Sequence, residues 1–133
     1  MVNYEFLYAF SKDVLKLDNS IRWIGIANKF GTLLNSEYRE GLKPLMNEEE
    51  NEEYALRTVT RHKTRLAFRE QIGSLIYAFG KYEKLNRATI IINEDYYLLI
   101  SLEVEVKNFD EIIMNKIIPL VQSEKHKFAG SDD

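Results

Sequence analysis

Residues 20–36, SIRWIGIANKFGTLLNS, carry the pattern of a β-hairpin. Apolar residues occupy almost every position of the first half, which predicts a strand covered on both faces, by the rest of the fold or by a partner chain. The segment NKFG predicts the turn, because Asn28 tolerates unusual backbone angles and Gly31 adopts positive φ at low cost. The segment TLLNS then returns as the second strand. Such a hairpin either frames a site or only builds a sheet, and we interpret it as scaffold.

A helix is expected on each side of this hairpin. Upstream, apolar residues recur at helical spacing and form one stripe: Phe6, Leu7, Phe10, Val14 and Leu17. Downstream, the segment NEEENEE begins a long helix, in which Asn47 and Glu50 have the spacing of a capping box. Its acidic first turns also complement the positive end of the helix dipole. This second helix is expected to extend to about Gln71, and Gly73 can end it.

After Gly73 the hydrophobic pattern changes to the period of strands. Three strands joined by short turns are expected, at residues 74–82, 88–93 and 96–106. The last strand has the clearest alternation, with these apolar side chains on one face: Leu98, Ile100, Leu102, Val104 and Val106. A final helix is expected from Asn108, with Glu111 in the capping-box position, and Pro119 should kink it. Residues 125–133 are expected to form a flexible tail.

The order of elements is therefore helix, two strands, helix, three strands, helix. Strands joined by short turns must be antiparallel, so the sequence predicts an α/β (α+β) fold with one five-stranded antiparallel sheet and helices on its faces. At 133 residues the chain has the length of a single domain, expected at residues 1–124, with the tail after it.

Composition excludes several classes of site. The chain has no cysteine, which rules out disulfides, thiolate metal sites, iron–sulfur clusters and cysteine nucleophiles. The formal net charge of −3 does not favour nucleic acid or anionic membranes as partners. The first residues carry no basic leader and no apolar run approaches the length of a membrane helix, so a cytoplasmic protein is expected.

The element order resembles that of the roadblock/dynein-light-chain family, within the wider profilin-like and longin-like group. Three segments carry the resemblance. WIGIANKFGTLLNS is similar to the family's first hairpin, ATIIINEDYYLLISLEV to its later pair of strands, and FDEIIMNKIIPLV to its closing helix. The long second helix, acidic first and then basic, departs from the family pattern, and the chain has only six glycines.

The resemblance implies a non-enzymatic protein without a cofactor. Members of the family form homodimers by joining sheet edges and packing the second helix against its mate, and they regulate or scaffold small GTPases and motor complexes. It therefore implies a homodimeric regulatory module for this chain. Its interface is expected on the second helix and the strand at 74–82, at Tyr77, Phe79, Leu66 and Val59.

A basic row is the most unusual feature of the second helix. Five cations lie within 13 residues that contain no acidic residue: Arg57, Arg61, Lys63, Arg65 and Arg69. Arg57, Arg61 and Arg65 are four apart and share one helix face, where like charges are mildly destabilising. We interpret Arg57, Arg61, Arg65 and Arg69 as a surface for an acidic partner such as a small GTPase. Alternatively, Glu52 and Glu53 neutralise the row, or its arginine stems cover apolar surface.

Other side chains suggest weaker alternatives. A small-molecule sensor of profilin-like or PAS-like type would hold its ligand between sheet and helix, at Tyr77, Tyr97 or Trp23. The same aromatic residues also suit a core. No metal site is expected, because His62 and His126 lie far apart without convergent ligands. Glu103 and Glu105 could serve acid–base chemistry in principle, but a solvated strand face explains them equally.

Overall fold

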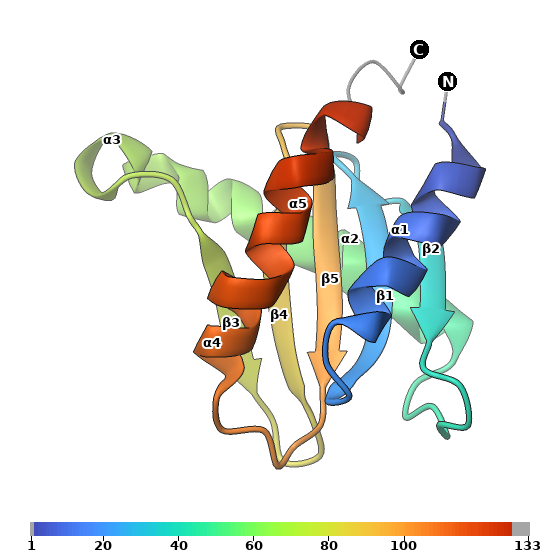
Figure 1. Ribbon diagram of the computed structural model, residues 1–133. Coiled ribbons are helices and arrows are strands. Elements are labelled where there is room, and N and C mark those ends of the chain that lie inside the picture. The colour runs from blue at the N-terminus through green and yellow to red at the C-terminus, as the bar shows by residue number, and fades with distance from the viewer. Residues whose placement is uncertain (1, 129–133) are drawn as a thin grey trace.

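A computed structural model describes residues 2–128, and Figure 1 shows their arrangement. Five strands form one antiparallel sheet in the order β2-β1-β5-β4-β3, so β2 and β3 are its edges. The predicted five-stranded antiparallel sheet and the predicted order of elements are confirmed. The strands are β1 (Ile21–Asn28), β2 (Leu33–Tyr38), β3 (Tyr77–Lys81), β4 (Asn86–Ile91) and β5 (Tyr96–Leu102).

Helices cover both faces of this sheet. One face carries α1 (Tyr4–Lys16) and a C-terminal helical segment, whereas α2 (Glu48–Arg65) crosses the other face (Figure 1). A short 3-10 turn, Leu66–Phe68, joins α2 to α3 (Arg69–Ile72). The C-terminal segment consists of α4 (Phe109–Ile112), a π-helical turn (Ile113–Ile117), α5 (Ile118–Glu124) and a 3-10 turn (Lys125–Phe128). No helix among residues 2–128 combines the length and the apolar character needed to cross a bilayer.

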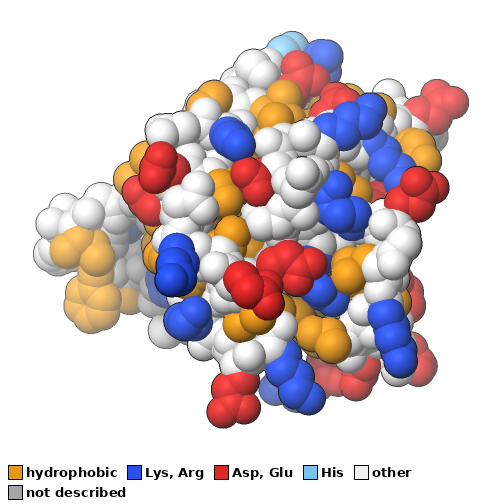
Figure 2. Space-filling model, turned by 60° about the horizontal axis from the view of Figure 1, so that its bottom comes forward, with side chains coloured by type: hydrophobic (Ala, Val, Ile, Leu, Met, Phe, Trp, Pro, Cys, Tyr) orange, Lys and Arg blue, Asp and Glu red, His pale blue; other side chains and the backbone are white. Residues whose placement is uncertain are grey.

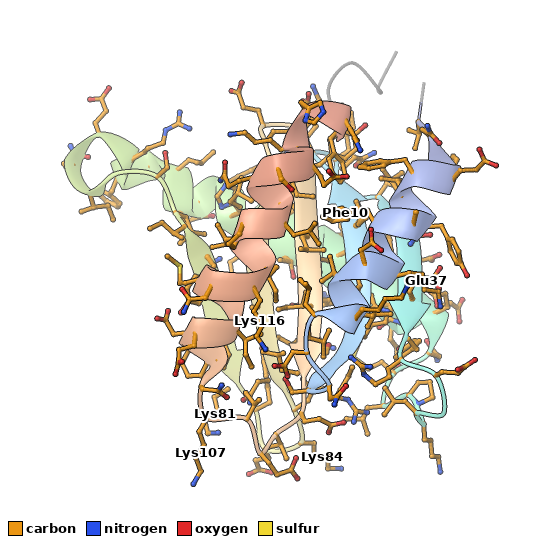
Figure 3. The ribbon with its side chains drawn as sticks, viewed as in Figure 1. Phe10, Glu37, Lys81, Lys84, Lys107 and Lys116 are labelled. Atoms are coloured by element: carbon orange, nitrogen blue, oxygen red, sulfur yellow. The ribbon has the colours of Figure 1, made fainter. Side chains whose placement is uncertain are left out.

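The core has two parts, one on each face of the sheet. The larger part lies beneath α1 and the C-terminal segment, where Phe10 of α1 points toward the sheet (Figure 3) and packs in the same cluster as Ile24 and Ile26. The smaller part lies beneath α2, where Ala55 and Val59 pack against Trp23, Ala27, Tyr97 and Leu99. Covering both faces explains why β1 and β5 are apolar along almost their whole length.

The opening hairpin forms as predicted, with two local differences. Gly31 has a φ of +84°, but Asn28 keeps negative φ and instead accepts backbone hydrogen bonds from Phe30 (2.9 Å) and Thr32 (3.0 Å). A bulge between Ile21 and Trp23 breaks the strict alternation of β1. Ile21 therefore packs on the α1 face with Ile24 and Ile26, rather than on the α2 face with Trp23.

Trp23 shows why the hairpin needs glycine at residue 25. Its indole ring lies across Gly25, so that a Cβ at this position would come within 2.3 Å of the ring. The indole N–H donates to the Ser36 hydroxyl on β2 (2.8 Å). Trp23 is only 2 % exposed, so its polar atom is satisfied inside the core, as a buried indole requires.

The ends of α2 follow local chemistry. Asn47 accepts from the Glu50 amide (2.8 Å) and the Glu50 carboxylate accepts from the Asn47 amide (2.9 Å), which confirms the predicted capping box. The helical path continues beyond Arg65 through the 3-10 turn and α3, and ends at Gly73, whose φ is +87°.

Two of the later strands are shorter than predicted. The strand expected at 74–82 is confined to β3, and the strand expected at 96–106 ends at Leu102. After Leu102 the chain turns, with the Val106 amide donating to the Glu103 carbonyl, so Val104 and Val106 do not continue the strand face. Glu103 is held by Arg22, whose Nη1 lies 3.1 Å and 3.2 Å from its two carboxylate oxygens. Glu103 therefore forms an ion pair and does not extend a solvated strand face with Glu105.

The C-terminal segment departs from the predicted helix in three ways. Asn108 makes no side-chain capping bond, so the predicted capping box at this end is wrong. A π-helical turn ends at Ile117, and Pro119 follows as the second residue of α5, where its missing amide donor costs the helix little. Phe128 is 2 % exposed and packs in the core, so residues 125–128 of the expected tail form part of the folded unit. Residues 129–133 lie outside the described part of the chain.

Asp18 ties the end of α1 to the C-terminal segment. Its carboxylate accepts from the Ser20 hydroxyl (2.6 Å), the Ser20 amide (2.9 Å) and the Lys116 ammonium (3.0 Å; Figure 3). Burial alone would raise the pKa of Asp18, but these hydrogen bonds and the Lys116 charge outweigh it and lower the pKa from 3.8 to about 2.

Because the folded-state pKa of Asp18 lies below its unfolded value, its ionisation stabilises the protein above about pH 4, and this contribution disappears as the pH falls to about 2. Asp18→Asn is therefore expected to lower the free energy of unfolding by about 2 kcal/mol at pH 7 and by almost nothing near pH 2. Urea unfolding at both pH values measures the difference. An equal loss at the two pH values would show that shape, not charge, matters at this position. Asp13→Asn, also on α1, is the control.

Candidate functional site

The β3 edge carries an overhanging helical segment. Strand β3 is the last in the sheet and has a hydrogen-bonded neighbour on one side only. The end of α2 and α3 project beyond this edge (Figure 1), and we call residues 66–76 the arm. Apolar side chains cluster on the arm (left in Figure 2), and four of them are exposed: Leu66 by 37 %, Phe68 by 64 %, Ile72 by 82 % and Ile76 by 60 %. This is a large concentration of apolar surface for so short a segment, and such patches mark contact sites.

Two predicted interface residues of β3 are engaged within the chain. The Tyr77 hydroxyl donates to Asp110 of α4, and this hydrogen bond, with burial, raises the Tyr77 pKa to about 12. Phe79 stacks on Phe109 of α4, with ring centroids 3.8 Å apart. Both side chains remain half-buried, and they secure β3 to the fold so that its outer edge presents backbone groups rather than these rings.

The other two predicted interface residues differ from each other in burial. Leu66 lies on the arm and is partly exposed, which is compatible with a contact to a second chain. Val59 is 1 % exposed and packs against the sheet in the core beneath α2. Val59 therefore stabilises the single chain, and we remove it from the expected interface.

The basic row of α2 divides into three parts. Arg57 pairs with Glu53 one turn earlier, with Nη2 2.6 Å from the carboxylate oxygen, as the neutralising alternative expected. Arg61 and Arg65 line a hollow between α2 and strands β3 and β4. Arg69 belongs to α3 and lines a different hollow with His62 and Tyr97. The row is therefore not one continuous surface.

A third arginine completes the hollow beside Arg61 and Arg65, which we call the basic cleft. Arg87 of β4 lies opposite Gly80 of β3 in the sheet and reaches the same space. Its guanidinium stacks on the Tyr54 ring of α2, 3.7 Å from the centroid. The sequence analysis missed Arg87, because it stands alone in its strand and reaches the cleft only through the pairing of β3 with β4. The cleft is half open to solvent, has a volume of about 340 Å³, and is lined by Tyr54, Arg61, Arg65, Ala78, Phe79, Gly80, Tyr82, Arg87 and Thr89.

Positive charge in this region is uncompensated. No acidic residue lines the basic cleft, and within residues 2–128 neither Arg61 nor Arg65 forms an ion pair. The neighbouring His62 is buried, which lowers its pKa, and the charges of Arg65 and Arg69 lower it further. His62 is therefore neutral at pH 7, and the positive charge of the cleft comes from its arginines.

The remaining candidate residues do not converge. Trp23 and Tyr97 lie on the α2 face of the sheet and Tyr77 on the opposite face, so these three cannot line one ligand pocket. His62 packs edge-on against Tyr97, with ring centroids 5.3 Å apart, whereas His126 belongs to the last turn of the described chain. Residues 2–128 contain no group of three or more histidine, aspartate or glutamate side chains that could hold a metal ion.

Solved structures with this arrangement are found despite low sequence identity. The chain superposes on MglB from Myxococcus xanthus with a TM-score of 0.74 at 13 % identity, covering 98 % of this chain and 93 % of that one. The fold is that of a roadblock domain. A roadblock/LC7 domain from Streptomyces avermitilis gives a TM-score of 0.70 at 6 % identity, over 90 % and 95 % of the two chains. The gliding protein MglB from Thermus thermophilus gives 0.70 at 12 % identity, over 95 % and 87 %.

These comparisons confirm the expected roadblock-like fold along almost the whole chain. The sequence itself matches no protein-family model and no curated protein. The likeness therefore concerns the roadblock fold, and at such low identity the function must be argued from the surfaces of this chain.

Proposed function

We propose that this protein is a non-enzymatic, homodimeric regulatory module that acts in the cytoplasm through protein contacts. The observation that carries this proposal is the combination of the open β3 edge with the exposed apolar arm beside it. Either feature alone is a liability for a single chain, because open edges and apolar patches both promote uncontrolled association. A second copy would cover both features at once.

The geometry supports a two-fold arrangement. Antiparallel pairing of β3 with β3 of a second copy would continue the sheet across both chains and satisfy the free backbone groups of each edge. Because the arm projects past β3 (Figure 1), such pairing would bring it over the neighbouring copy. Ile72 and Phe68 would then be buried between the chains, which supplies the hydrophobic contribution that a strand pair alone lacks. The solved structures of similar fold include one described as MglB with a tetrameric arrangement, so self-association has a precedent in this fold.

The resemblance to the roadblock family suggests the class of partner, a small GTPase or another signalling protein. Two arginines of the basic row, Arg57 and Arg69, are exposed outside the basic cleft, where a protein with an acidic surface could reach them. Such a partner would compete with Glu53 for Arg57 and would meet Arg69 at the hollow beside His62. One similar solved structure is a gliding protein by name, which is compatible with a regulatory role.

Solution mass is the first test of the dimer. Light scattering at low and high salt should give about twice the chain mass of 15.6 kDa, and the dimer should resist salt because its contacts are mainly apolar. A monomer at every concentration would refute the homodimer. A dimer that dissociates in high salt would point instead to a charged interface.

The GTPase assignment has its own test. Small GTPases from the same organism, loaded with GTP or GDP, are tested for binding and for a change in their rate of GTP hydrolysis. We expect preferential binding to one nucleotide state, weakened by the double charge reversal Arg57→Glu with Arg69→Glu. Failure of the whole panel to bind would contradict this partner class without affecting the dimer proposal.

A further inference from the structure

We propose that the basic cleft binds a small anion with two linked phosphate groups, either inorganic pyrophosphate or the diphosphate of a nucleotide. This inference concerns a small ligand and uses residues of one chain only. Strand β3 contributes both to this cleft and to the proposed dimer edge, but ligand binding and dimerisation are separate properties with separate tests.

Unpaired positive charge is concentrated in a half-open cleft between α2 and the sheet. Arg61 and Arg65 extend from adjacent turns of α2, and Arg87 comes from the sheet opposite. Like charges four residues apart are destabilising in a helix, so the free protein tolerates an arrangement that a bound anion would stabilise. One phosphate group carries about −1.5 to −2 charges. Three guanidinium groups therefore match two phosphate groups better than one.

One cation of the cleft, Arg87, is fixed in position in the free protein. Stacking on Tyr54 and contact with the sulfur of Met46 hold the half-buried Arg87 guanidinium in place, so less side-chain entropy is lost on binding. Arginine is also the residue best suited to phosphate, because its planar fork can donate two parallel hydrogen bonds to phosphate oxygens. Arg61 and Arg65 are exposed on α2, so Arg87 is the cation of the cleft that these contacts hold in place.

Strands β3 and β4 form the base of the basic cleft. Two cross-strand pairs form it, Ala78 opposite Thr89 and Gly80 opposite Arg87. Ala78 has a small side chain and Gly80 has none, and the Tyr82 ring lies beside Gly80. The volume of the cleft, about 340 Å³, lies in the range of small-molecule sites. Tyr54, Tyr82 and Thr89 also line the cleft, and each carries a hydroxyl group that can donate a neutral hydrogen bond.

The recess favours a small anion over an acidic protein surface. Arg87 is half-buried between α2 and the sheet, so we expect a small anion to reach its guanidinium more readily than a carboxylate anchored on a folded partner. Arg57, one turn before Arg61 on the outer helix surface, is already neutralised by Glu53. Arg61 and Arg65, which line the basic cleft, have no such acidic partner and remain exposed to solvent.

Isothermal titration of the full chain with inorganic pyrophosphate tests the proposal. We expect saturable binding that weakens with salt, as charge-assisted contacts require. Arg61→Gln and Arg65→Gln should each weaken binding about tenfold or more, since each removes charged hydrogen bonds. Arg57→Gln is the matched control, because it removes a cation from the same helix outside the cleft, and it should change the affinity less than about threefold. Absence of saturable binding, or equal affinity in the three variants, would overturn the proposal.

Nucleotides and an acidic peptide distinguish between the possible ligands of the cleft. Tighter binding of GDP or ADP than of pyrophosphate would identify a nucleotide diphosphate, whereas equal binding would identify the free anion, and both results support the site. A poly-glutamate peptide that binds while pyrophosphate does not would overturn it in favour of an acidic protein surface. Light scattering on the same samples separates the two proposals, because a monomer that binds pyrophosphate refutes only the homodimer.

Discussion

Replacing Ile72 with glutamate is expected to convert the proposed dimer into a monomer. Ile72 is 82 % exposed in the single chain, so the substitution should cost the monomer almost nothing. In the proposed assembly the same side chain lies between the arm and the second copy, where an unpaired carboxylate is strongly disfavoured. We expect the dimer dissociation constant to rise at least about 100-fold, which corresponds to about 2.7 kcal/mol. Sedimentation equilibrium over a concentration series measures this change.

Phe30→Glu is the matched control for this prediction. Phe30 is 69 % exposed, so the same kind of charge replaces an apolar side chain of similar exposure. It lies in the turn between β1 and β2, at the opposite end of the sheet from β3. The control should leave the dissociation constant unchanged. If Phe30→Glu dissociated the dimer and Ile72→Glu did not, the interface would lie at the β2 end of the sheet, and the role proposed for the arm would be wrong.

The parts of the fold that sequence predicted correctly are those set by neighbouring residues. The capping box at Asn47 and Glu50 needs only two residues three positions apart, and the structure has both of its hydrogen bonds. Gly31 supplies positive φ in the hairpin turn, and Gly73 does so after α3. In each case the chemistry that sets the conformation is complete within a few residues.

The prediction failed where contacts distant in sequence decide the conformation. The alternation in β5 predicted a strand as far as Val106, but the ion pair between Glu103 and Arg22, 81 residues apart, accompanies the turn that ends the strand. The bulge beside Arg22 likewise depends on how β1 pairs with β5. No local pattern contains this information.

The basic cleft combines a feature set by neighbouring residues with one set by contacts distant in sequence. The row of arginines on α2 was visible because helical spacing is a local property. The sequence did not show which of these arginines line the same cleft. That depends on Arg87, which follows Arg65 by 22 residues and is brought into place by the register of β3 against β4. A lone arginine in a strand carries no signal that distinguishes a cleft residue from a solvated one.

The C-terminal turn gives the second prediction with a large effect. Phe128 is the centre of an aromatic cluster, with its ring centroid 4.9 Å from that of Phe6, 5.2 Å from Phe10 and 5.4 Å from Tyr96. Phe128→Ala removes these contacts and leaves a cavity between α1 and the C-terminal segment. We expect the free energy of unfolding to fall by about 3 kcal/mol or more, a large part of the stability of a domain this size. Urea unfolding, analysed at matched protein concentrations, measures the loss.

The control replaces an exposed phenylalanine, Phe30, with alanine. Phe30→Ala should change the free energy of unfolding by less than about 0.5 kcal/mol, because Phe30 is largely in water already. Deletion of residues 125–133 should destabilise the protein at least as much as Phe128→Ala, since it removes the same ring. A loss below about 1 kcal/mol for both changes would mean that the last turn does not close the core, and that the domain ends where the sequence placed its boundary, at residue 124. The expected loss would instead assign Phe128 to the same core as α1, because no surface phenylalanine contributes that much.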